Sequence, residues 1–116
     1  MSAAGARPVD LAHLSTYTGG DAALNAEVLQ LFLDQAAVLM VQLRNALEAA
    51  DQKSWYAIAH SLKGAARGIG AFAMADAAAE VEKVPAGSAQ EALTVLHTLS
   101  NHASAVQLFI EAYLGR

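Results

Sequence analysis

One stretch decides the fold predicted for this chain: Trp55-Tyr56-Ala57-Ile58-Ala59-His60-Ser61-Leu62-Lys63-Gly64-Ala65-Ala66-Arg67-Gly68-Ile69-Gly70. A helical period of about 100° per residue brings its large apolar residues onto one narrow stripe. The stripe consists of Trp55, Ile58, Leu62, Ala65 and Ile69. Such a stripe is typical of the buried seam of a helix in a bundle.

The rest of the chain also favours helices. Alanine occurs 28 times against 15 for valine, isoleucine and threonine combined, which favours helix over strand. Turn and cap residues divide the chain into a short helix from Pro8 to Gly19-Gly20, a long one from Asp21 to about Ala50, the stretch above, a helix at 71–83, and a last helix that Ser88 caps. Gly70 is expected to end the central helix with a positive φ.

Each flanking helix shows its own apolar stripe. The long helix carries Val28, Phe32, Leu39, Leu43, Ala46 and Ala50, supported by Leu24, Leu31 and Leu47. The surplus residues Val38, Met40 and Val41 are either covered by a second contact or exposed. The later stripes are Met74, Ala78 and Val81, and then Ala92, Leu96, Leu99, Ala103, Val106, Ile110 and Leu114.

Short connections make successive helices antiparallel neighbours. The sequence therefore predicts an all-α fold, an up-down-up-down antiparallel four-helix bundle with a short extra N-terminal helix across its end. Residues 1–7 are expected to be a disordered lead, and residues 8–116 a single bundle domain.

His60 is the candidate functional residue, because it points away from the predicted seam into solvent. An exposed imidazole is a nucleophile that a partner can reach. Cations share its face, and cations suit a transferring phosphoryl group. Gly64, one turn later, costs about 1 kcal/mol inside a helix relative to alanine, so it is interpreted as clearance for a large partner. The neighbours on this face are Lys53, Tyr56, Lys63, Gly64 and Arg67.

The run His60-Ser61-Leu62-Lys63-Gly64, with Gly70 ten residues after the histidine, resembles the signature of histidine-containing phosphotransfer (HPt) domains. The resemblance extends over the helical layout from about Val9 to Leu114. It implies a four-helix bundle that carries a phosphoryl group on His60 between receiver-domain aspartates. In some domains similar to this one the position of Glu82 holds Glu, and in others Gln.

Glu82 is the second candidate residue, from geometry. His60 lies ten residues before the turn at Gly70 and Glu82 twelve after it, so both sit about 15–18 Å from the turn on adjacent antiparallel helices. A carboxylate there can accept a hydrogen bond from the imidazole and leave the other ring nitrogen as the nucleophile. The alternative is an ordinary solvated glutamate.

Composition excludes several classes of function. The net charge of −4 argues against nucleic acid as a partner, and the absence of cysteine excludes thiolate chemistry and disulfides. The start lacks an apolar signal core, and no run of about 18 apolar residues occurs, so we expect a cytoplasmic monomer without a membrane span. No metal site is predicted.

The expected function is a stand-alone phosphocarrier between the receiver domains of a hybrid histidine kinase and a response regulator. Lys63 would neutralise phosphoryl charge, Arg67 is a candidate to assist, and Tyr56, Lys53 and Gly64 would meet the partner. Mg²⁺ is expected on the receiver, and the chain needs no cofactor of its own. Two alternatives are an interaction module that uses the same face without phosphorylation, and a hydrolase or phosphomutase with a phosphohistidine.

Overall fold

The computed structural model describes residues 7–116, and its secondary structure is entirely helical within that range. The helices are α1 (Leu11–Thr18), α2 (Ala22–Glu48), α3 (Gln52–Gly68), α4 (Phe72–Lys83) and α5 (Ala89–Tyr113). The all-helical prediction is therefore confirmed. The predicted disordered lead falls almost wholly on residues 1–6, which lie outside the described residues; Arg7 is exposed and precedes the first helix.

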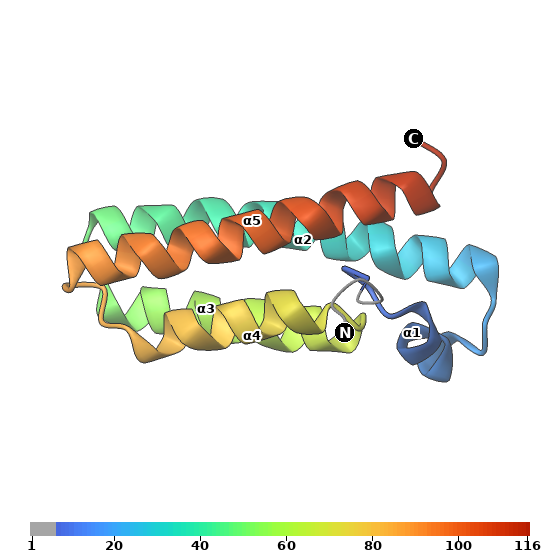
Figure 1. Cartoon of the computed structure of the whole chain (residues 1–116), viewed down its shortest axis with the longest axis horizontal. Coiled ribbons are helices and arrows are strands. Elements are labelled where there is room, and N and C mark those ends of the chain that lie inside the picture. Colours follow the sequence, from blue (N-terminus) through green and yellow to red (C-terminus); the bar gives the residue numbers. More distant parts are fainter. Residues whose placement is uncertain (1–6) are drawn as a thin grey trace.

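The four longer helices pack side by side (Figure 1). Contacts join α2 with α3, α3 with α4, α4 with α5, and α5 back with α2, so that the helices close a ring around one core. Because α2 and α5 are longer than α3 and α4, the N-terminal part of α2 extends past the α3–α4 turn. The short α1 lies at that end of the bundle, next to α2.

Aspartate side chains begin three of the helices, as capping preferences lead one to expect. Asp10 accepts the His13 N–H at 3.1 Å, Asp21 accepts the Leu24 N–H at 3.0 Å, and Asp51 accepts the Ser54 N–H at 3.2 Å. Ser88 occupies the N-cap position of α5, as predicted, but its side chain makes no capping hydrogen bond.

Gly70 joins the α3–α4 turn to the segment before α1. Its φ of +83° confirms the predicted left-handed conformation. The Asp10 N–H donates to the Gly70 carbonyl at 2.9 Å, and a Cβ on Gly70 would lie 2.6 Å from the Asp10 carbonyl oxygen. Glycine is therefore required twice here, for its backbone conformation and for the close approach of a second chain segment.

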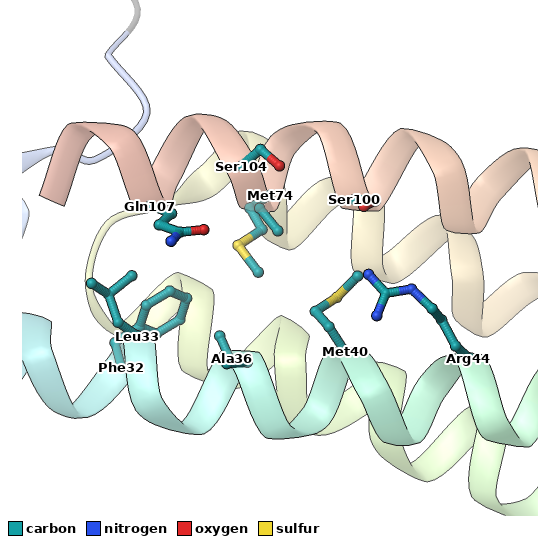
Figure 2. A pocket seen from close by; sticks show the side chains of 11 residues that line it. Phe32, Leu33, Ala36, Met40, Arg44, Met74, Ser100, Ser104 and Gln107 are labelled. Carbon is teal, nitrogen blue, oxygen red and sulfur yellow. The ribbon is translucent and has the colours of Figure 1, made fainter. Parts of the chain in front are cut away.

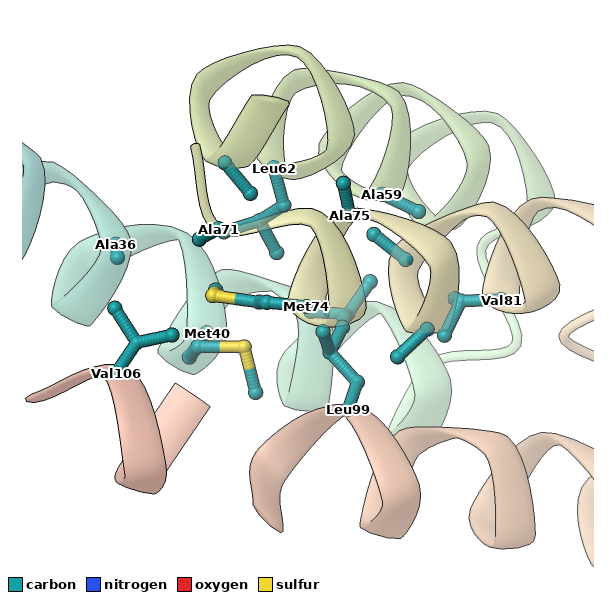
Figure 3. Close-up of a cluster of buried hydrophobic side chains, with 14 of the residues drawn as sticks. Ala36, Met40, Ala59, Leu62, Ala71, Met74, Ala75, Val81, Leu99 and Val106 are labelled. Atoms are coloured by element: carbon teal, nitrogen blue, oxygen red, sulfur yellow. The ribbon is translucent and has the colours of Figure 1, made fainter. Parts of the chain in front are cut away.

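Small and large apolar side chains interlock in the core (Figure 3). Alanines dominate the contact between α3 and α4, where Ala59, Ala71 and Ala75 have no exposed surface. Small side chains let these two helices approach closely, and α3 and α4 share the most extensive contact in the bundle. The larger fully buried side chains are Trp55, Leu14, Leu29, Leu43, Leu62, Met74, Leu99 and Ile110.

The predicted seams are correct for α4 and largely correct for α5, but need correction elsewhere. In α3, Trp55, Leu62 and Ile69 are buried, as predicted. The predicted seam residues Ile58 and Ala65 are only half-buried, and Ala59 and Ala66 beside them are buried in the core. The seam is turned because α3 packs most closely on the alanine-rich α4. In α5, Ala103 and Leu114 are only half-buried.

The long-helix stripe was also wrong in part. Leu24, Leu31 and Ala50 are exposed, Val28, Leu39 and Leu47 are half-buried, and the core of α2 is built from Asn25, Leu29, Phe32, Ala36, Met40, Leu43 and Ala46. Of the surplus residues, Met40 is buried while Val38 and Val41 are exposed. Several turns of α2 are apolar on both faces, so periodicity alone could not choose the buried one.

The length and composition of α2 would allow it to cross a membrane. Core helices of globular domains can be equally long and apolar, and α2 contributes its buried face to the contacts with α3 and α5. The fold therefore accounts for the buried apolar residues of α2, while its exposed leucine and valine side chains need a separate explanation.

Candidate functional site

His60 lies near the middle of α3 on its solvent-facing side. Its side chain is 61% exposed, although Ala59 beside it is completely buried. The predicted direction of the imidazole, away from the core, is thus observed. A partner can approach this ring without any rearrangement of the bundle.

Glu82, in the last turn of α4, meets the imidazole. Its Oε2 lies 2.7 Å from His60 Nδ1, which places the two residues at the same height of the α3–α4 hairpin, as the count from Gly70 implied. An ionised carboxylate only accepts hydrogen bonds, so Nδ1 carries the hydrogen and donates. In the neutral ring the lone pair then resides on Nε2, on the opposite side of the imidazole from Glu82.

Lys63 contacts the same carboxylate. Its Nζ donates to Glu82 Oε1 at 2.7 Å, so each carboxylate oxygen has one donor. Burial alone would raise the pKa of Glu82, whose side chain is only 10% exposed, but the hydrogen bonds and charges of Lys63 and His60 outweigh it and hold that pKa below its ordinary value. Glu82 therefore stays anionic at neutral pH.

The remaining predicted residues surround the ring on α3. The Tyr56 ring stacks beside the His60 ring, with centroids 6.0 Å apart and planes 14° from parallel. Gly64 borders open space, because a Cβ built there would find no atom within 4 Å. Packing therefore does not require glycine at this position, which leaves its cost within the helix to be explained by something outside the chain.

The basic patch differs from the one predicted. Lys53 and Arg67 are exposed, and within residues 7–116 their side chains make no hydrogen bond or ion pair. Lys63 instead is largely covered and paired with Glu82. The structure thus brings Glu82, Lys63 and Tyr56 together at His60, leaves Lys53 and Arg67 exposed on the same helix, and ties one of the three cations to the carboxylate.

The described part of the chain offers neither a metal site nor a pocket at His60. No group of three histidine or carboxylate side chains suited to a metal ion occurs in the described part of the chain. A hollow of about 280 Å³ lies between α2 and α5, with Met40, Arg44 and Met74 among its walls (Figure 2). His60 does not line it. The site is therefore a surface and not a pocket.

Comparison with known families decides what this surface belongs to. The family model of the Hpt domain matches residues 27–108, a range that includes His60, Lys63 and Glu82. The chain belongs to the HPt domain family. HPt domains are phosphocarriers and not ATP-using enzymes. Membership of the family therefore gives this chain a general function in phosphotransfer within a phosphorelay.

Solved structures agree with the family in their fold. Histidine-containing phosphotransfer protein B (HptB) from Pseudomonas aeruginosa PAO1 is similar with a TM-score of 0.83 and 22% identity, over 93% of this chain and 95% of that one. The HPT domain from the Hpt sensor hybrid histidine kinase from Shewanella is similar with a TM-score of 0.69 and 22% identity, over 90% and 95%. The search of curated proteins gave no match.

Sequence reasoning missed two features of this HPt site. One is that Glu82 binds Lys63 as well as His60, although Lys63 follows His60 by three residues and so shares its side of the helix. The other is a pair of hydrogen bonds from α3 to the connection that follows α4. The indole N–H of Trp55 donates to the Val84 carbonyl at 2.8 Å, and the Ala86 N–H donates to the Gln52 side chain at 2.7 Å.

Proposed function

We propose that this chain is a phosphocarrier that accepts a phosphoryl group on His60 Nε2 from a receiver-domain aspartate and passes it to a second receiver. The observation that carries the proposal is the 2.7 Å contact of Nδ1 with Glu82, on an imidazole that is otherwise exposed. The scaffold we infer is an up-down-up-down four-helix bundle with a short additional N-terminal helix. It would act as a cytoplasmic monomer without nucleic acid or membrane partners.

The groups that the transfer needs from this chain are already in place. The bond between phosphorus and the aspartyl oxygen breaks as a bond forms between phosphorus and Nε2, and the aspartate leaves as a carboxylate. The proton on Nδ1 stays on the ring. The product ring carries positive charge, and Glu82 stabilises that charge through the hydrogen bond it already accepts. Mg²⁺ would be held by the receiver.

Lys63 has two roles in this proposal, as a hydrogen-bond donor to Glu82 and as a donor to the phosphoryl group. An ammonium group has three donor hydrogens, of which Glu82 uses one in the resting protein. The others can donate to a phosphoryl oxygen on His60. Arg67 and Lys53, exposed on the same helix, add positive charge for an anionic partner surface, and Tyr56 supplies an exposed aromatic edge.

The docking surface also extends onto α2. Gln42 lines a hollow between α2 and α3 together with Ala57. Leu31 precedes Gln42 by three helical turns and therefore lies on the same side of α2. Leu31 is 64% exposed and the neighbouring Val38 is 56% exposed. Exposed apolar side chains on α2, which packs beside α3, suit a partner that buries them on docking.

Phosphotransfer from a purified receiver tests the proposal. The receiver is loaded with phosphate, mixed with the chain, and the acid-labile, base-stable label on the chain is measured. We expect label on the wild type and on His97→Gln, a matched exposed histidine of α5, and none on His60→Gln. Equal labelling of His60→Gln would overturn the assignment. Binding of receivers without any label on wild type would instead favour an interaction module.

A further inference from the structure

The connection between α4 and α5 is attached to the first turn of α3. Trp55 donates its indole N–H to the Val84 carbonyl at 2.8 Å, and Gln52 accepts the Ala86 N–H at 2.7 Å. Trp55 has no exposed surface and Ala86 is 2% exposed, whereas Gln52 is exposed, so the attachment runs from the core to the surface of the bundle. Two side chains of one helical turn thereby hold both ends of a short chain segment.

This segment follows directly after the residue that orients His60. Glu82 lies one residue before the last residue of α4, and Val84 leaves the helix in an extended conformation with φ −105° and ψ 125°. The helix therefore lacks the left-handed cap that satisfies the last carbonyls of many helices. Helix ends without such support fray, and a frayed last turn would carry the Glu82 carboxylate away from the imidazole.

We propose that Trp55 and Gln52 are positioning residues, which hold the last turn of α4 so that Glu82 stays on His60 Nδ1. The inference deepens the proposed function and rests on it for its consequence in phosphotransfer. Neither side chain touches the imidazole. They act through the main chain at Val84 and Ala86, and through it on the carboxylate.

Side chains of α3 fix how the end of α4, which carries Glu82, is aligned with His60. Trp55 precedes His60 by five residues on the same helix, and the indole is buried while the imidazole is exposed. The helix that carries the phosphoryl acceptor thus also fixes the chain that carries its carboxylate. The Trp55 and Gln52 hydrogen bonds, at 2.8 and 2.7 Å, therefore oppose any shift of α4 along α3 that would separate Glu82 from His60.

A pair of variants at Gln52 tests the proposal without disturbing the core. Gln52→Ala removes the acceptor of the Ala86 N–H, whereas Gln52→Glu keeps an accepting oxygen at the same position. Trp55→Phe removes the indole N–H. The control is Tyr113→Phe, which removes a side-chain hydrogen bond to Asn25 at the opposite end of the bundle.

Two readouts are taken from the unphosphorylated protein. Amide hydrogen exchange is followed at Glu82, Lys83 and Val84, and the protonated nitrogen of the His60 ring is identified by NMR of nitrogen-labelled histidine. We expect exchange at these amides to rise about fivefold in Gln52→Ala and Trp55→Phe, which is the effect of losing one hydrogen bond. The Nδ1–H form of His60 should decrease in parallel.

Gln52→Glu should behave like wild type in both readouts, and Tyr113→Phe should leave the Glu82 amides and the ring unchanged. Unchanged exchange and an unchanged ring in Gln52→Ala would overturn the inference, even if Trp55→Phe failed to fold. Because both readouts need no phosphate, they decide the positioning role separately from phosphotransfer. If the wild type accepts no phosphoryl group, the proposed function fails while the positioning result stands.

Discussion

Replacing Glu82 with glutamine tests the geometry at His60, because a carboxylate has two accepting oxygens and a carboxamide has one. Both oxygens of Glu82 are in use, Oε2 by His60 Nδ1 and Oε1 by Lys63 Nζ, each at 2.7 Å. Because the two donors approach different oxygens, the single oxygen of Glu82→Gln can keep only one of these two contacts. The charged Lys63 is the stronger donor, so the amide NH₂ is left facing Nδ1.

An NH₂ group donates, so Nδ1 must become the acceptor and the ring hydrogen must move to Nε2. That removes the lone pair from the nitrogen that faces a partner. A change of about 1 kcal/mol in the hydrogen bond at Nδ1 shifts the two ring forms about fivefold, and phosphotransfer should slow by a similar factor. Lys63 keeps a hydrogen bond to the amide oxygen but loses the carboxylate charge, which, for side chains 19% and 10% exposed, should cost about 1 kcal/mol of unfolding free energy.

The assay is NMR of the nitrogen-labelled His60 ring, with urea unfolding of the same samples. The matched control is the double variant Lys63→Met with Glu82→Gln, in which the amide oxygen is released from Lys63 and can accept from Nδ1 again. We expect the Nδ1–H form to fall in the single variant and to recover in the double variant. An unchanged ring in Glu82→Gln would refute the shared-carboxylate geometry.

The other predictions concern two glycines and acid. Gly64→Ala should raise stability by about 1 kcal/mol in thermal unfolding yet slow transfer from a receiver, and an unchanged rate would refute clearance. Gly70→Ala should lower stability by at least about 2 kcal/mol in urea, because its φ is +83° and its Cβ would meet Asp10; a smaller loss would contradict that contact. Since the pKa of Glu82 is lowered in the folded state, its stabilisation should be complete above pH of about 4.3 and fall below it. Glu82→Gln should therefore lose less stability on acidification than the wild type, measured by urea unfolding at several pH values, and equal slopes would refute this.

The site was largely predictable from sequence because its geometry depends on counting along two helices. A turn at Gly70 and a rise of about 1.5 Å per residue suffice to place Glu82 opposite His60. The exposed direction of the imidazole follows equally from the helical period. These features need no knowledge of side-chain packing, and the structure reproduces both.

What could not be predicted depends on packing between helices. Residues on both sides of α2 are apolar, so only the contacts with α3 and α5 determine that Met40 is buried and Val38 exposed. The attachment of Trp55 to Val84 joins residues 29 positions apart through a main-chain carbonyl, which has no side-chain signature. The pairing of Lys63 with Glu82 depends on a side-chain conformation that spacing alone leaves open.

The position of the phosphoryl group on the ring tests the central claim most directly. The wild-type chain, with nitrogen-labelled histidine, is phosphorylated by a loaded receiver and examined by phosphorus and nitrogen NMR. The contact between Nδ1 and Glu82 predicts phosphorus bonded to His60 Nε2, with Nδ1 still protonated. Phosphorus bonded to Nδ1, or to a residue other than His60, would contradict the account.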